Sequence, residues 1–170
     1  MDEALCTFRA PGPSSLYWHL RTGRLQKIGD AYVPFRLFRV CYLMNKEKVE
    51  RIFAMDVVDG SLDLFEFRTP PREDEMILLQ TRNFLLSSLT KAQALHAVRE
   101  KVLRIVFQQG FFKLRSASLK LEALPGEIYL PYWLAFYGQG DAVRCRVMDA
   151  VRRRLEGAKA STFFEQWLAA

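Results

Sequence analysis

The strongest constraint on this chain is a short block of sequence that occurs twice. The first copy reads Tyr-Val-Pro-Phe-Arg-Leu from Tyr32, and the second reads Tyr-Leu-Pro-Tyr-Trp-Leu from Tyr129. A matched block follows each copy, in which Arg, Met, Asp, Val and Leu coincide without a gap between residues 51–63 and 144–156. Because internal repeats constrain architecture more strongly than single residues do, we expect two related hairpin-bearing units.

The residues that the two copies share are expected to be structural. Each proline stands near the start of a strand, where a missing N–H is tolerated. Each aspartate follows a Met at a strand end, where a carboxylate readily accepts backbone N–H groups of a turn. We therefore interpret this pair as turn caps and not as a catalytic dyad. The expected structural residues are Tyr32, Pro34, Asp56, Gly60, Pro131 and Asp149.

The remaining pattern predicts an α+β protein. Thr90-x-x-Gln93 is a capping box, and apolar residues at helical spacing follow it, which predicts a helix over 91–109 that Gly110 stops. Ser161 is expected to cap a last helix. Strands are expected at 31–43, 49–58, 62–67, 76–79, 111–121, 128–137 and 142–151. Helices on one face of antiparallel meanders define the α+β class.

The domain limits follow from the two prolines and the charge cluster at 69–75, which end any regular element. We expect a strand-rich first unit at 1–69 and a linker and edge segment at 70–90. The second unit is expected at 91–170, with a helix, antiparallel strands and a C-terminal helix. Such small sheets would expose strand edges and an aromatic face, and a homodimer is one arrangement that would bury them.

Composition narrows the class of protein. Half of the 170 residues are hydrophobic and 26% are charged, which is typical of a globular chain. No apolar run approaches the roughly 18 residues of a membrane span, and the first nine residues are acidic without a signal-peptide core. Three isolated cysteines and two histidines form no metal or catalytic pattern. We expect a cytoplasmic protein with no cofactor, no metal, no membrane contact and no enzyme activity.

The hairpin blocks resemble the cystatin-like fold, and more narrowly a PepSY-like unit. In that family a strand commonly ends in Asp, with Gly four residues later in the turn. Asp56-Val-Val-Asp-Gly60 matches this pattern, whereas Asp149-Ala-Val-Arg-Arg153 has Arg in place of the Gly. The resemblance covers about half of the chain. It implies two cystatin-like units and a binding or inhibitory role.

Basic residues suggest one kind of partner. Residues 91–120 contain seven Lys or Arg against one Glu, and a second cluster lies in 144–154. Together they could bind phosphates of nucleic acid, with nearby aromatic rings stacking on bases, although a solvated strand edge explains them as well. The candidate contacts are Lys101, Arg104, Lys113, Arg115, Arg144, Arg146, Arg152, Arg153 and Arg154.

Aromatic residues of the second copy suggest another kind of partner, an extended peptide in an aromatic groove. Its walls would be Tyr129, Tyr132, Trp133 and Tyr137. No Gly-rich phosphate loop and no catalytic motif occurs in the chain. The leading hypothesis is therefore a non-catalytic binding or scaffolding protein with a protein or peptide partner. The alternative is a nucleic-acid-binding protein that uses residues 91–120 and the run Arg152–Arg154.

Overall fold

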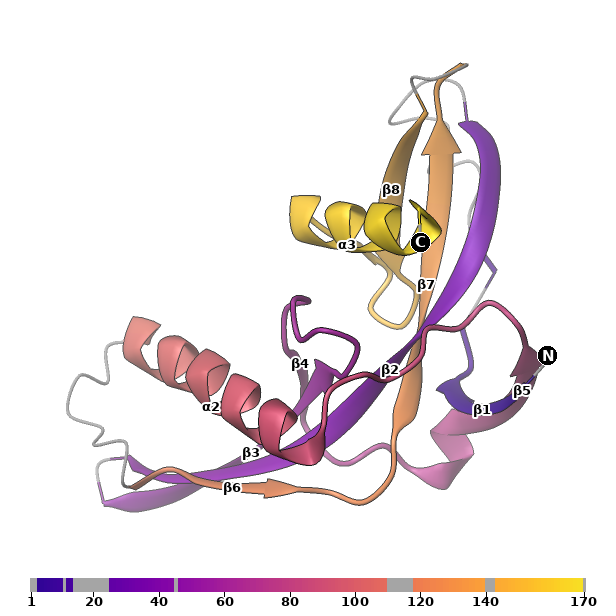
Figure 1. Cartoon of the computed structure of the whole chain (residues 1–170). Helices are drawn as coiled ribbons and strands as arrows, with labels where there is room; N and C mark the ends of the chain where they lie inside the picture. The colour runs from indigo at the N-terminus through magenta and orange to yellow at the C-terminus, as the bar shows by residue number, and fades with distance from the viewer. Residues whose placement is uncertain are drawn as a thin grey trace. The chain divides into compact units, whose positions relative to one another are not determined.

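The computed structural model describes residues 3–10, 12–13, 25–44, 46–109, 118–139 and 143–169 (Figure 1). Strands with two helices and one short 3-10 turn make up this part of the chain, which confirms the α+β class. The elements follow in the order β1 (Glu3–Phe8), β2 (Leu25–Met44), β3 (Glu47–Asp56), β4 (Phe65–Phe67), η1 (Glu73–Glu75), β5 (Met76–Thr81), α2 (Lys91–Gln108), β6 (Lys120–Ala123), β7 (Ile128–Tyr137), β8 (Arg144–Asp149), β9 (Arg154–Leu155) and α3 (Ala158–Ala169).

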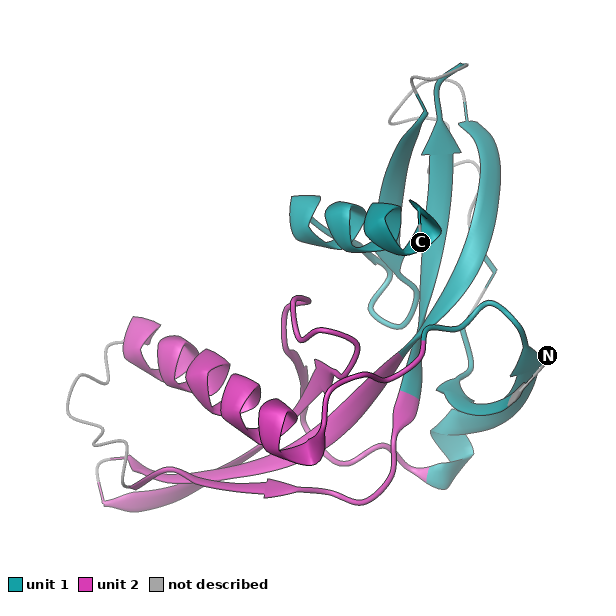
Figure 2. Cartoon of the chain, in the orientation of Figure 1, with its two compact units in different colours: residues 1–33, 73–85, 129–170 teal, residues 34–72, 86–128 magenta. Residues whose placement is uncertain are grey.

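The chain forms two compact units whose segments interleave along the sequence (Figure 2). Unit 1 contains residues 1–33, 73–85 and 129–170, and unit 2 contains residues 34–72 and 86–128. Strand β2 contributes its residues up to Val33 to unit 1 and those from Pro34 onward to unit 2. These ranges differ from the consecutive ranges 1–69, 70–90 and 91–170 that the sequence suggested.

Unit 2 is built on an antiparallel meander of β2, β3 and β4. Strand β2 pairs with β3 from Phe35 to Met44 without a break in register, and β3 pairs with β4 from Ile52 to Ala54. Strand β6 pairs with the other edge of β2, where Phe38 lies opposite Ala123. The meander agrees with the sequence interpretation. Strand β6, however, was expected in the second unit and pairs with the first hairpin instead.

Helix α2 begins at the capping box that the sequence predicts. The Thr90 side chain accepts the backbone N–H of Gln93, and the Gln93 side chain accepts the N–H of Thr90. The helix buries one stripe at i, i+4 spacing, which consists of Ala94, Val98, Val102 and Val106. Residues 110–117, with Gly110 and the first part of the strand expected at 111–121, lie outside the described residues, as does the segment 14–24.

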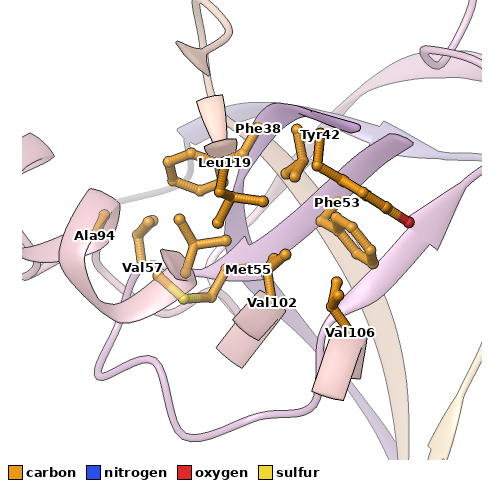
Figure 3. Packing of buried hydrophobic residues seen from close by; sticks show 11 residues of the cluster. Phe38, Tyr42, Phe53, Met55, Val57, Ala94, Val102, Val106 and Leu119 are labelled. Atoms are coloured by element: carbon orange, nitrogen blue, oxygen red, sulfur yellow. The ribbon is translucent and has the colours of Figure 1, made fainter. Parts of the chain in front are cut away.

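The core of unit 2 lies between α2 and one face of the first hairpin (Figure 3). Phe38 and Tyr42 of β2 point toward the helix stripe, together with Phe53 and Met55 of β3. Val40 of β2 belongs to the same buried cluster. Burying an apolar side chain of this size stabilises a fold by roughly 1.5–3 kcal/mol. From the sequence, this helix was expected in the second unit. The structure places it on the first hairpin, where its apolar stripe packs against the apolar face of β2 and β3.

Unit 1 contains the second hairpin and α3. Strand β7 lies next to β2 and β1 in the strand order, and β5 pairs with β1. Strand β8 pairs with β7 from Tyr132 to Tyr137, and the short β9 pairs with β8. Helix α3 lies against these strands, with the ring of Phe164 centred 5.3 Å from that of Tyr132 (Figure 1). The helix begins at Ala158, so the Ser161 cap expected from the sequence is wrong by one turn.

The two hairpins have the same pairing register at the repeated block. Phe35, the residue after the first proline, lies opposite Asp56. Tyr132, the residue after the second proline, lies opposite Asp149. In both hairpins the paired strands run antiparallel, and pairing starts directly after the proline. The sequence identity between the blocks therefore corresponds to one shared local geometry.

A backbone hydrogen bond repeats this correspondence. The N–H of Val57 donates to the Pro34 carbonyl at 3.0 Å, and the N–H of Ala150 donates to the Pro131 carbonyl at 3.1 Å. Pro131 lies near the start of β7, which begins at Ile128 as expected, whereas β2 begins at Leu25, so Pro34 lies inside its strand and the expected strand-entry role is corrected for that residue. Each proline marks the point where its hairpin ladder begins.

Both repeated aspartates are fully buried and cap the turns that follow them. The Asp56 carboxylate accepts the N–H groups of Gly60 at 2.8 Å, Leu62 at 3.0 Å and Asp59 at 3.2 Å. Burial raises the pKa of Asp56 above its usual value, against the lowering effect of these three N–H donors. Because each N–H would otherwise be unpaired in the turn, the carboxylate determines the turn's path.

Asp149 has the equivalent role in unit 1. Its carboxylate accepts the N–H groups of Val151 at 2.8 Å and Arg152 at 3.0 Å. The Arg152 guanidinium adds an ion pair to the same carboxylate at 2.5 Å. Asp56 and Asp149 belong to different units, and each carboxylate bonds to residues of its own turn. The turn-cap interpretation accounts for both residues.

The correspondence does not extend to the helices. Helix α2 covers the face of the first hairpin that contains Phe38. Helix α3 covers the face of the second hairpin that contains Tyr132. In the first hairpin the residue equivalent to Tyr132 is Phe35, and Phe35 and Phe38 lie on opposite faces of β2. On the second hairpin, the position that corresponds to Phe38 is Ala135, which packs in a separate small cluster. The shared geometry is therefore confined to the hairpins.

Candidate ligand-binding site at the edge of strand β8

A cavity of about 490 Å³ opens in unit 1 beside the edge of β8 that faces away from β7. Three parts of the chain form its walls: residues 144–146 of β8, residues 155–158 that lead into α3, and Ser161 in the first turn of that helix. Tyr137 of β7 completes the lining. Ligand pockets in proteins typically have volumes of roughly 300–1,000 Å³, so the cavity is large enough for a ligand.

Among the described residues, the first half of β8 has no strand paired with its outer edge, because β9 is only two residues long. Strand β9 pairs with Met148 and Asp149, and the next residue, Glu156, donates its N–H to the Val147 carbonyl at 2.9 Å. Continuing this register would bring residue 158 opposite Cys145. However, Ala158 is the first residue of α3, so the chain turns away from the sheet at that point. The cavity occupies the place that a longer β9 would fill.

Backbone polar groups of β8 face this cavity. In an antiparallel ladder, alternate residues direct their N–H and C=O groups to the same edge. Since the Val147 carbonyl bonds to the β9 side, the N–H and C=O of Cys145 point to that side as well. No described residue supplies a backbone partner there. A strand edge with free donors and acceptors is a template for a further strand.

Two arginines give the cavity its positive charge. Arg144 and Arg146 are exposed, and they share the face of β8 that Tyr137 also occupies. Within the described part of the chain, neither guanidinium forms an ion pair. The lining acid, Glu156, is already bridged by Arg152 at 3.3 Å and by Arg154 at 4.0 Å. The positive end of the α3 dipole adds to the field.

Cys145 lines the cavity but is not suited to nucleophilic chemistry. Burial raises the pKa of its thiol to about 11, and the negative charge of Glu165 adds to the effect. The thiol is therefore neutral near pH 7, whereas nucleophilic cysteines act as thiolates. The residues that line the cavity thus present charge, hydrogen-bonding groups and a neutral thiol, which suits binding.

The expected nucleic-acid contacts fall in different places. The Lys101 ammonium donates to the Leu62 carbonyl, and Arg104 is exposed on α2; both belong to unit 2. Arg152 is held by Asp149, as described above. Lys113 and Arg115 lie outside the described residues. Of the nine candidates, Arg144 and Arg146 line the cavity, and the other unit 1 arginines, Arg152, Arg153 and Arg154, lie in and after the turn that follows β8.

The expected aromatic groove is not formed as the sequence suggested. Tyr132 is buried against α3, on the opposite face of β7 from Tyr129, Trp133 and Tyr137. The Tyr129 ring packs edge-on against Phe84. Trp133 and Tyr137 belong to a small apolar cluster, and Tyr137 alone of the four lines the cavity. Alternation along the strand separates residues that stand close together in the sequence.

The α3 side of the cavity was not foreseen from the sequence. This side is lined by Gly157, Ala158 and Ser161. Because the sequence suggested a helix start at Ser161, the first two residues were not expected to contribute to a site. A Gly directly before a helical pattern was a usable signal, because Gly is tolerated at helix N-caps. Cys145 itself carries a free, buried thiol.

Comparison with protein-family models, curated proteins and solved structures found no match to this chain. The cystatin-like resemblance therefore stays a prediction. Neither described helix combines the length and apolarity that crossing a membrane would require. Likewise, the described residues contain no group of three or more His, Cys, Asp or Glu side chains that could hold a metal ion.

Proposed function

We propose that this chain is a non-catalytic binding protein whose ligand carries negative charge and occupies the cavity beside β8. The single observation that supports the proposal most is the placement of Arg144 and Arg146. Both are exposed at a cavity wall and form no ion pair with a described residue. Elsewhere in the described chain, Arg36, Arg39, Arg51 and Arg152 each pair with a carboxylate.

The free energy of such binding comes from desolvated ion pairs and from hydrogen bonds to the strand edge. Two arginines beside a helix N-terminus form a suitable field for carboxylate or phosphate oxygens. Of the described residues that line the cavity, Cys145 is the one cysteine, and its raised pKa keeps the thiol from acting as an activated nucleophile. A role in binding therefore fits the lining better than a role in catalysis.

Equilibrium binding of labelled anionic probes tests this function. Fluorescence anisotropy is measured with an acidic decapeptide, for wild type and for an R144A/R146A variant. The matched control is K91A/R104A, which removes two exposed cations from α2 in unit 2. We expect the dissociation constant to rise about tenfold or more in R144A/R146A and to change less than about twofold in the control.

Two results would contradict the proposal. Equal losses of affinity in both variants would indicate a diffuse positive field, as the nucleic-acid alternative requires. In that case the affinity for a single-stranded oligonucleotide would also fall equally in the two variants. Turnover of any substrate that is abolished by a change at a cavity-lining residue would contradict the non-catalytic role.

A further inference from the structure

We propose that a second copy of this chain pairs with the outer edge of β5, so that the sheets of two copies join edge to edge across a two-fold axis. This inference goes beyond the proposed function and does not depend on it, because β5 and β8 stand at different places in the strand order. Strand β5 is the last in that order and lies beside β1 (Figure 1). Among the described residues, no strand pairs with its other edge.

Strand β5 lacks the features that normally protect a strand edge. It reads Met-Ile-Leu-Leu-Gln-Thr, without a charged residue or a proline. Charges and prolines are common means by which proteins prevent edge-to-edge pairing. In the described part of the chain, the other strands with one paired neighbour are β4, β6 and β9, and each of them contains a charged residue. In β5, by contrast, the most exposed residue is an apolar one, Leu78, at 79%.

The pairing of β5 with β1 shows which backbone groups lie at the outer edge. The N–H of Arg9 donates to the Glu75 carbonyl at 3.5 Å, in continuation of the register of the two strands. Because alternate residues of an antiparallel strand direct their N–H and C=O groups to the same side, the odd-numbered residues of β5 bond toward β1. The outward-facing backbone groups therefore belong to Met76, Leu78 and Gln80.

A two-fold axis at Leu78 uses all three of these residues. Leu78 then lies opposite its own equivalent, and Met76 lies opposite Gln80 of the second copy. Each such pair can exchange two backbone hydrogen bonds. Residues directly opposite each other share a face of the sheet, so the two Leu78 side chains would meet. The same face of β1 contains Cys6 and Phe8, which lie opposite Leu78 and Met76, so the contact would continue an apolar surface.

Charges at the two ends of β5 favour this arrangement and a second copy as the partner. The acidic turn η1 directly precedes the strand, and the exposed Arg82 directly follows it. With the axis at Leu78, Arg82 of each copy would lie beside η1 of the other. A parallel pairing would place like charges together, and a shift of the antiparallel register by two residues would place Arg82 beside Arg72. Opposite charges therefore favour one register, in which each copy complements both ends of the other.

Size-exclusion chromatography with light scattering over a dilution series tests the association. We expect wild type to be a dimer at high concentration and to dissociate on dilution. Leu78→Lys should raise the dimer dissociation constant at least about tenfold, because it replaces the central apolar contact by two like charges directly opposite each other. The matched control is Leu86→Lys, at a leucine in unit 2 that is 71% exposed. It should change the dissociation constant less than about twofold.

Cysteine cross-linking tests the register. The background is C6S/C41S, which removes the thiol that lies opposite residue 78 on β1. Opposite residues of a hydrogen-bonded pair have Cα atoms about 5.5 Å apart, within the roughly 4.4–6.8 Å of disulfides. We therefore expect Leu78→Cys to form a covalent dimer under mild oxidation. Gln80→Cys is the control, because its two copies would be about 13 Å apart along the strands.

Three results would overturn the inference. One is a monomer at all concentrations, and another is a dimer that Leu78→Lys does not weaken, since association would then use another face. The third is equal cross-linking at residues 78 and 80, which would show contact without the proposed register. The R144A/R146A variant leaves β5 unchanged, so failure of the anion-binding proposal and failure of this inference are observed independently.

Discussion

Gly60 and Arg153 occupy the same position in the two hairpin turns, and both have left-handed backbone conformations. Their φ angles are +73° and +54°, and each lies four residues after a buried aspartate. Glycine adopts this conformation without strain, whereas an L side chain costs roughly 1–2 kcal/mol there. The turn of unit 1 is therefore strained at a point where the turn of unit 2 is relaxed.

Replacing Arg153 by Gly should stabilise the protein. We expect a gain of about 1 kcal/mol in the free energy of unfolding, because Gly removes the left-handed strain. For a chain of this size that corresponds to a rise in Tm of about 2–4 °C. Thermal unfolding followed by circular dichroism measures the shift. Arg153→Ala is the control, since it removes the guanidinium but keeps the strain, and an equal gain there would contradict the explanation.

The converse change, Gly60→Ala, should destabilise the protein. An added Cβ would lie 3.5 Å from the Leu89 side chain, an ordinary contact, so the cost comes from φ alone. We expect a loss of about 1 kcal/mol. Denaturant unfolding measures this loss, provided that the slope of the unfolding free energy against denaturant concentration is unchanged. A neutral result would show that this turn relaxes to another conformation.

Removing the charge of either turn-capping aspartate should lower stability. In Asp149→Asn, one oxygen that accepts from Arg152 becomes an NH₂ group facing another donor. In Asp56→Asn, at least one of three backbone N–H groups loses its acceptor. We expect a loss of about 1–3 kcal/mol in each case. The exposed Glu47→Gln change is the charge-matched control, and an equally large effect there would refute the capping role.

Tyr32 should titrate well above the ordinary tyrosine pKa. Burial, the charge of Asp30 and a hydrogen bond to Asp30 raise its pKa to about 12. Since this folded pKa lies above the ordinary tyrosine value of 10.0, folding favours the neutral phenol. Its stability contribution is intact below about pH 10 and is lost as the pH rises toward 12. Ultraviolet titration of tyrosinate in wild type and Tyr32→Phe measures this, and an unchanged high-pH step in the variant would contradict the assignment.

Cys145 should alkylate slowly until the pH is high. Its thiol pKa is raised from 9.0 to about 11, which lowers the thiolate fraction roughly 100-fold below pH 9. In a C6S/C41S background, mass spectrometry follows reaction with iodoacetamide. We expect rapid labelling in urea and slow labelling of the folded protein that accelerates toward pH 11. Fast labelling at pH 8 in the folded state would contradict the buried, neutral thiol.

Sequence reasoning succeeded where neighbouring residues decide the structure. The Thr90–Gln93 capping box starts α2, and the repeated Pro-to-Asp block forms hairpins of equal register. The capping box depends on hydrogen bonds between residues three apart in the chain, and each hairpin forms between strands that are consecutive in the sequence. The start of α3 was misplaced because Ser161 is a good N-cap by type, whereas Gly157 and Ala158 had to be recognised from the path of β9.

The sequence by itself determined the class of fold, the two hairpins and the buried aspartates that cap their turns, because these follow from residue type and short-range spacing. Only the tertiary structure decided that α2 packs on the first hairpin, that the two helices cover non-equivalent faces, and that Arg144 and Arg146 border a cavity. These features depend on which apolar faces meet across long stretches of chain. The periodicity of apolar side chains shows that a helix or strand has an apolar face, but not which other element will cover that face.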